Sequence, residues 1–173
     1  MLSAPRFSLF ASTVLYLVAS TAACAADTRP QSISAVPGKE VCSFTSATLG
    51  DKRVRPQVCV IRGNFSSDMY ALKIDGKVVV HGIDDQTTAG ISATFENRTL
   101  QLRCVPQEVF PKATPEETLA EVRRVLPEGT EARVKELAEL LGTGSGTGGM
   151  ELGRLCTGSA DGNALIAVQV NFD

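Results

Sequence analysis

The chain has 173 residues and a mass of 18.3 kDa, and its 43% hydrophobic and 21% charged residues are typical of one globular domain. Its formal net charge of −2 excludes the basic field that binding to phosphates requires, so we expect no nucleic-acid partner. The single histidine and the five cysteines form no cluster with metal-ligand spacing, so we expect neither a metal nor another cofactor.

Residues 1–25 are typical of a secretory signal peptide. Arg6 supplies one positive charge, and an uncharged stretch over residues 7–26 follows it. Ala23 and Ala25 provide the small side chains that signal peptidase requires, which favours cleavage before Ala26. The alternative of an uncut membrane anchor is weaker, because serine and threonine dilute the apolar stretch.

A further alternative concerns Cys24. Thr21, Ala22 and Ala23 before it resemble a bacterial lipobox, in which the cysteine is lipidated and holds the protein on a membrane. A lipobox usually has leucine where this chain has Thr21, so the match is partial. We expect export to the periplasm or out of the cell, and contact with the outer membrane only if Cys24 carries lipid.

Four cysteines remain once the leader is removed, and an even number in an exported chain predicts two disulfides. The segments on either side of Gly50 and Asp51 have the pattern of a hairpin. Counting outward from that turn places Cys42 opposite Cys59, where a cross-strand disulfide is expected. Cys104 is then left to pair with Cys156.

Residues 26–38 contain two prolines and no periodicity, so we expect a tether, with order beginning near Lys39. From there the chain alternates as strands do. The segments 70–74 and 77–81 flank Asp75 and Gly76, a strong hairpin signal that places Tyr70 opposite His81. A second hairpin is expected from 91–95 and 99–104.

The hydrophobic period changes at Thr114, which stands before Pro115 and three residues before Glu117. This is the N-terminal signature of a helix, and Thr130 begins a second helix. We therefore expect an inserted helical hairpin over about 114–142, followed by a Gly-rich loop over 142–149.

Strand patterns return at 150–157 and 164–172 around a turn at 161–163. We expect a single disulfide-stapled domain over residues 39–173 of the α+β class. Its body should be mainly an antiparallel β meander, either a sandwich or an open barrel, with the helical hairpin against one sheet face or capping one end.

Catalytic chemistry has little support in the sequence. A hydrolase would use His81 as the base with Ser66, Ser67 or Ser92 as the nucleophile, but none of these serines lies in a nucleophile-elbow pattern. We expect no catalytic residue, no metal ligand and no enzyme activity.

The polar segment 82–90 is longer than a turn requires, and exposed loops commonly carry binding function. We expect Asp84, Asp85, His81 and Tyr70 to form part of a partner-binding surface. The first hypothesis is an exported bacterial envelope protein that binds another protein, as an inhibitor or an immunity factor. The alternative is a structural accessory lipoprotein of an envelope assembly or secretion complex.

Overall fold

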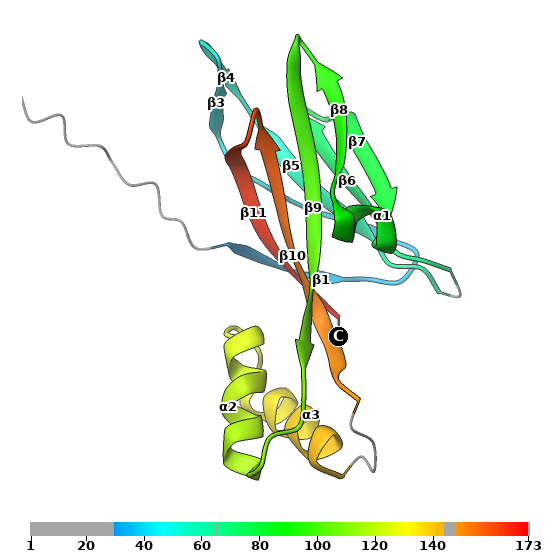
Figure 1. Ribbon diagram of the computed structural model, residues 1–173, viewed down its shortest axis with the longest axis vertical. Coiled ribbons are helices and arrows are strands. Elements are labelled where there is room, and N and C mark those ends of the chain that lie inside the picture. The colour runs from blue at the N-terminus through cyan, green and yellow to red at the C-terminus, as the bar shows by residue number, and fades with distance from the viewer. Residues whose placement is uncertain (1–29, 65, 144–147, 173) are drawn as a thin grey trace, which may run out of the picture.

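The computed structural model describes residues 30–64, 66–143 and 148–172. The expected signal peptide, Cys24 with its lipobox, and residues 144–147 of the Gly-rich loop lie outside these ranges. The described chain forms eleven strands and three helices. Two sheets face one another, and a helical hairpin lies beyond one end of them (Figure 1). Within the described residues, no helix is both long enough and apolar enough to span a bilayer.

The first sheet has four antiparallel strands in the order β2-β5-β6-β7. Their bounds are Glu40–Phe44, Pro56–Ile61, Met69–Ile74 and Lys77–Ile83. A small hairpin of β3 (Ala47–Leu49) and β4 (Lys52–Val54) extends from β2 and β5. Cys42 lies directly opposite Cys59, and a disulfide joins them, so the first predicted pairing is confirmed.

The second sheet has five strands in the order β1-β11-β10-β9-β8. Their bounds are Gln31–Ala35, Asn163–Phe172, Met150–Ala160, Arg98–Val109 and Ile91–Phe95. Cys104 lies opposite Cys156, and the second predicted disulfide joins them. Only β1 and β11 are parallel, whereas every other pair of neighbouring strands in the described chain is antiparallel.

The expected tether over 26–38 is wrong from Gln31 onward, because this segment contains strand β1. Ile33 and Ala35 alternate with Ser32 and Ser34, and this short alternation lies between two prolines that obscure it in the sequence. Ile33 and Ala35 belong to the core between the sheets. The folded part of the chain therefore begins with β1 at residue 31, eight residues before the expected start at 39, because β1 pairs with β11.

The register of the β6–β7 hairpin also differs from the prediction. The turn is as expected, with Ile74 paired with Lys77, but an irregularity after Leu72 shifts the rest of the ladder by one residue. Tyr70 therefore lies opposite Gly82, and His81 lies opposite Ala71. Because side chains alternate along a strand, this shift puts Tyr70 and His81 on opposite faces of the sheet.

The expected polar loop over 82–90 is also corrected. Strand β7 continues to Ile83, and helix α1 (Asp84–Ala89) follows at once. Gly90 ends this helix with a φ of 95°, a conformation that favours glycine, and β8 then begins in the second sheet. The segment is thus a short helical corner between the two sheets.

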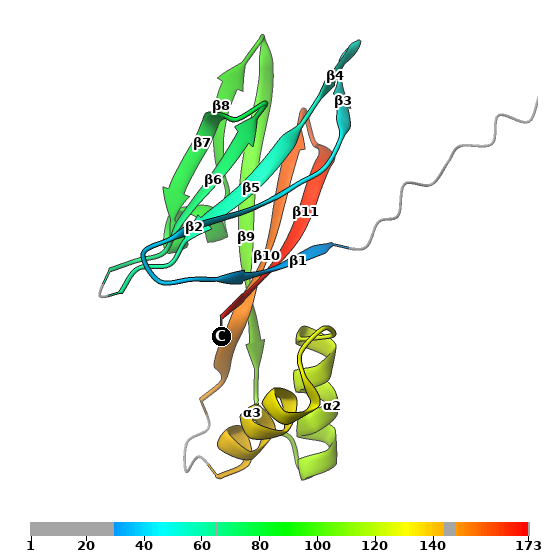
Figure 2. The ribbon, with the colours of Figure 1, turned by 180° about the vertical axis from the view of Figure 1, so that it is seen from behind.

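The helical hairpin forms as predicted from α2 (Pro115–Val125) and α3 (Glu131–Thr143). Thr114 Oγ1 accepts a hydrogen bond from Glu117 N at 3.2 Å, and Glu117 Oε2 accepts one from Thr114 N at 3.2 Å, which completes the capping box. The helices share a separate hydrophobic core with the ends of β9 and β10, including Val109 and Leu152. They therefore lie past one end of the sheets, on a ribbon of two strands (Figures 1 and 2).

The fold class is confirmed in outline. The chain is mostly antiparallel β-structure with one helical insertion, and the two sheets do not close into a barrel. It is not a single meander, because its strands are divided between two sheets and one pair is parallel. Buried side chains from both sheets form the main core, among them Val58, Leu72, Leu102 and Val168.

Candidate functional site

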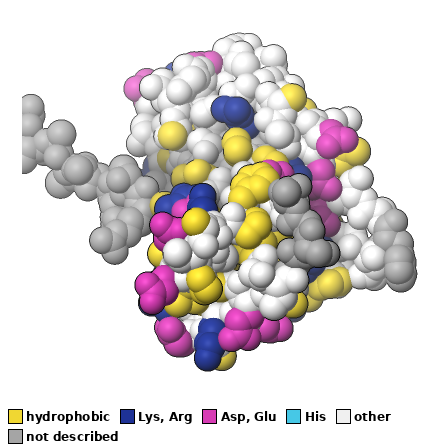
Figure 3. Space-filling view, turned by 60° about the horizontal axis from the view of Figure 1, so that its bottom comes forward, with side chains coloured by type: hydrophobic (Ala, Val, Ile, Leu, Met, Phe, Trp, Pro, Cys, Tyr) yellow, Lys and Arg dark blue, Asp and Glu magenta, His cyan; other side chains and the backbone are white. Residues whose placement is uncertain are grey.

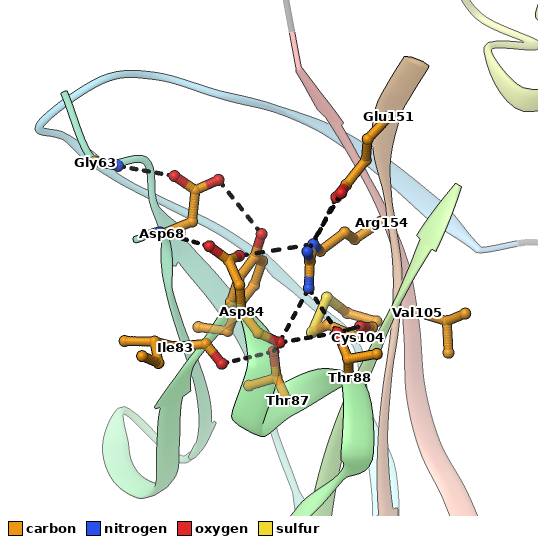
Figure 4. A network of polar contacts seen from close by, with 12 residues as sticks. Gly63, Asp68, Ile83, Asp84, Thr87, Thr88, Cys104, Val105, Glu151 and Arg154 are labelled. Atoms are coloured by element: carbon orange, nitrogen blue, oxygen red, sulfur yellow. Dashed lines mark hydrogen bonds and ion pairs between the residues drawn. A yellow bond between two sulfur atoms is a disulfide. The ribbon is translucent and has the colours of Figure 1, made fainter. Parts of the chain in front are cut away.

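Asp84 is the first residue of α1, and its side chain points between the two sheets (Figure 4). Asp84 Oδ2 accepts a hydrogen bond from Asp68 N at 3.0 Å. Asp84 Oδ1 lies 3.7 Å from Arg154 Nε of strand β10. Asp84 therefore joins the corner helix to both sheets and is only partly exposed.

Arg154 is the centre of this network and is 7% exposed. Its Nε and Nη2 donate to the carboxylate of Glu151 at 2.7 and 3.4 Å. Its Nη1 donates to Thr88 Oγ1 at 2.9 Å and to the carbonyl oxygen of Asp84 at 3.1 Å. A buried charge needs such partners, and here they come from a strand and from the corner helix. The arginine thus links strand β10 to the corner helix.

Tyr70 lies on the inner face of β6 and is fully buried. Its ring centroid is 5.7 Å from Arg154 Cζ, and its hydroxyl donates to Asp68 Oδ2 at 3.5 Å. Burial and then the nearby charge of Asp84 raise the pKa of Tyr70 well above its usual value. Burial acts to lower the pKa of Arg154, but its hydrogen bond to Glu151 and the surrounding charges raise it overall. The network therefore holds its protons in place and stabilises the fold.

A chain that begins at Ala26 offers a direct test of this burial, because Tyr70 is the only tyrosine after residue 25. We expect no tyrosinate absorbance while the protein remains folded, even at pH values above the ordinary tyrosine pKa of about 10. Since the folded pKa is raised, the stability from the protonated hydroxyl is complete below pH about 10 and declines as the pH rises further. Ultraviolet titration, with the denatured chain as the control, measures this. A tyrosinate transition near pH 10 in the folded protein would contradict the burial.

His81 lies on the opposite, outer face of the same sheet and is exposed. Across the strands it is in register with Ala71, Cys59 and Cys42, so the disulfide and the imidazole share one row. The next row on this face joins Ile61, Met69 and Ile83 side by side, with Glu40 beyond Ile61. We call these two rows, together with the row of Lys73 and Val78 on the same side, the outer face of the β2–β5–β6–β7 sheet.

Large apolar side chains are unusually exposed on this outer face. Met69, Val78 and Ile83 are 47%, 48% and 39% exposed. Met69, Val78 and His81 border a shallow hollow of about 290 Å³, whose floor includes Ala71 and Cys59. A face that carries such side chains and is left uncovered by the described residues is typical of an interaction surface.

The four residues expected at the partner-binding surface are therefore divided by the structure. His81 lies on the outer face and Asp85 is exposed on the first turn of α1, whereas Tyr70 and Asp84 belong to the interior network. Sequence reasoning missed Met69, Val78 and Ile83. For Val78 and Ile83 a signal was present in the sequence. Val78, Val79 and Val80 follow one another, so apolar side chains must lie on both faces of this strand, whereas a strand with one solvated face has polar residues at every second position.

Other features of the described chain offer less chemistry. The side chains of Glu40, Cys42 and Cys59 come close enough to hold a metal ion, but both sulfurs belong to the disulfide. An apolar groove of about 390 Å³ lies between α2 and α3, lined by Leu119 and Ala138. Figure 3 brings this end of the molecule forward and shows hydrophobic side chains among acidic and basic ones.

The two intramolecular disulfides indicate that the protein folds in an oxidising compartment outside the cytoplasm. Comparison of this chain with protein-family models, curated proteins and solved structures finds no match.

Proposed function

We propose that this chain is an exported bacterial envelope protein that acts without catalysis, by binding another protein through the outer face of the β2–β5–β6–β7 sheet. The observation that carries the proposal is the exposure of Met69, Val78 and Ile83 on this face, with the half-buried Ile61 beside Met69. Burying such side chains against a partner is favourable, because it removes apolar surface from water. His81 and the ion pair of Lys73 with Glu40 border the same face and would give the contact polar specificity.

The position of β7 supports this assignment. β7 is an edge strand of its sheet, and Ile83 lies at its end, two residues before the exposed Asp85. Phe44, on the opposite edge strand β2, is also 50% exposed. The guanidinium of Arg55 covers its ring, with Cζ 3.6 Å from the ring centroid. The uncovered apolar surface is therefore concentrated near β6 and β7, and we place the centre of the interface at Met69.

The partner decides between two roles for this surface. An inhibitor or immunity factor would hold one soluble enzyme, such as one that attacks the cell wall. A structural accessory lipoprotein would instead join a multi-subunit envelope or secretion complex, anchored at the outer membrane through Cys24. Both roles belong in the periplasm or outside the cell, and both use the same face.

The experiment is site-specific photo-crosslinking in the producing cell, with a photoreactive residue at Met69 and, as the control, at Leu140. Leu140 is a matched position, because it is 50% exposed but lies on α3. We expect a discrete crosslinked protein from position 69 that is absent from position 140. Crosslinks at both positions, or at neither, would contradict the proposal.

Charge substitution then measures the strength of the contact with the protein so identified. We expect Met69→Glu to weaken binding at least about tenfold, or roughly 1.4 kcal/mol, because it places a carboxylate in the desolvated centre of the interface. Leu140→Glu should stay within about twofold of the unchanged protein. Titration calorimetry measures both, and an unchanged melting temperature shows that Met69→Glu has not unfolded the sheet. Equal affinities for the two variants would exclude this face.

A further inference from the structure

A second hollow lies at the junction of the helical hairpin with the five-stranded sheet, far in the fold from the outer face described above. One wall is formed by β1 and β11, and the other by the turn between α2 and α3 with the first turn of α3. In Figures 1 and 2 this turn lies at the end of the hairpin nearer to β1. The hollow has a volume of about 300 Å³ and is lined mainly by polar residues, including Ser32, Ser34, Thr130, Arg133 and Asn171.

Asn171 is the unusual member of this lining. It is 9% exposed, and its Nδ2 donates to Ser32 Oγ at 2.8 Å. Its Oδ1 is buried and has no hydrogen-bond partner among the described residues. If the amide is turned the other way, Ser32 bonds the oxygen and the nitrogen is left over, so one polar end stays unmatched in either orientation. Buried amide groups are nearly always paired, so the partner of this end lies outside the described residues.

The register explains why Asn171 faces the hollow. On β11, Val168 and Val170 point into the core between the sheets, so Asn171 points the other way, toward the helical hairpin. Ser34 is its direct partner on β1 and lies on the same face. A polar side chain at this buried position is not required by the core.

The opposite wall offers hydrogen-bond donors that suit an anion. Helix α3 has 13 residues, and its N-terminus opens on the hollow at Thr130, whose Oγ1 accepts from Arg133 N at 3.3 Å. The backbone N–H groups of the first turn precede any acceptor within the helix, and the helix dipole favours an anion there. The guanidinium of Arg133 adds a full positive charge, and its ion pair with Glu136 at 3.0 Å orients it.

We infer that this hollow binds an α-carboxylate that carries a neighbouring N–H, as found in a free amino acid or in the last residue of a peptide. The carboxylate would accept from the first turn of α3 and from Arg133, and the N–H would donate to Asn171 Oδ1. Glu128, exposed in the turn between α2 and α3, would attract the N–H group of the ligand through its negative charge. The inference does not rest on the proposed function, because the two surfaces lie on different sheets.

The test is titration of the isotope-labelled mature protein with small probes, followed by NMR of the Asn171 side-chain amide and the first-turn amides of α3. We expect alanine or N-acetylalanine to shift these signals with a Kd on the order of 10 mM or tighter. The tighter of the two identifies the source, since only N-acetylalanine mimics a peptide end and only alanine carries a free ammonium. Acetate and sulfate, which offer no N–H, should bind at least about tenfold more weakly.

Two variants test the contacts separately. Arg133→Gln should weaken binding of the better probe at least about tenfold, whereas Arg124→Gln should leave it within about twofold. Arg124 is a matched control, because it also pairs with a glutamate three residues away, at 2.8 Å, but belongs to α2 and does not line the hollow. Ser32→Ala, which frees Asn171 without adding bulk, should change the affinity for the N–H probes but not for acetate.

Three results would overturn the inference. The first is the absence of any chemical-shift change when alanine or N-acetylalanine is added at concentrations up to about 10 mM, the expected Kd. The second is equal binding of acetate or sulfate, which would reduce the site to an ordinary helix N-terminus. The third is equal loss of binding in the Arg133 and Arg124 variants, which would show that only the general charge of the hairpin matters.

Discussion

Replacing both Cys104 and Cys156 by alanine should lower the free energy of unfolding by about 4 kcal/mol, the largest effect that we expect from removing one covalent link. The two residues are separated by 52 positions in the sequence, so their disulfide restricts the unfolded chain strongly. Both are fully buried in the core, where the disulfide joins adjacent strands. Urea denaturation without reductant, followed by circular dichroism, measures the difference.

The second disulfide supplies the comparison. Cys42 and Cys59 are separated by 17 positions, so their replacement by alanine should cost about 3 kcal/mol, or about 1 kcal/mol less. Reducing agent should remove the difference between each variant and the unchanged protein. A larger cost for the Cys42 and Cys59 variant would show that the length of the closed loop does not set the order of the two effects.

Replacing Arg154 by methionine should cost roughly 3 kcal/mol, because it removes the cation that joins β10 to the corner helix and leaves its partners without their donor. The value is at the lower end of the range for breaking a buried ion pair. Asp84 and Glu151 have side chains that are 27% and 29% exposed, so water can partly replace the guanidinium. The same denaturation experiment measures this cost.

Arg103→Met is the matched control for Arg154→Met. Arg103 is exposed on the neighbouring strand β9, and its hydrogen bond to the carbonyl oxygen of Thr88 is long, at 3.4 Å, so its loss should cost less than about 0.5 kcal/mol. Adding Asp84→Asn to the Arg154 variant should recover part of the lost stability, since it removes an unpaired charge. Equal costs for Arg154 and Arg103 would show that the network does not hold the sheets together.

Local chemistry made much of the fold predictable from sequence. The turn residues Asp75–Gly76 and Glu96–Asn97 adopt positive φ values, as two-residue hairpin turns require, and both hairpins were predicted. The capping box at Thr114 likewise sets the start of α2. Turn position fixed the register of Cys42 with Cys59, and with it both disulfides.

What the sequence did not reveal depends on contacts between distant segments. β1 exists because β11 lies beside it, and the parallel pairing has no local signal. The irregularity after Leu72 moves His81 to the other face, and the consecutive valines 78–80 do not alternate, so they do not specify the register. Two of the partners of Arg154, Asp84 and Thr88, belong to the corner helix, 70 and 66 positions away in the sequence, so this link between the sheets could not be read from the neighbours of Arg154.

The helical hairpin has its own hydrophobic core, and the core between the two sheets contains no residue of α2 or α3. Its two ends leave from Val109 and Met150, which are paired across the ribbon of β9 and β10. An insertion attached in this way can change in length and sequence without disturbing the domain that carries it. Substitutions in the hairpin away from the hollow beside β1 should therefore leave the stability of the stapled sheets unchanged.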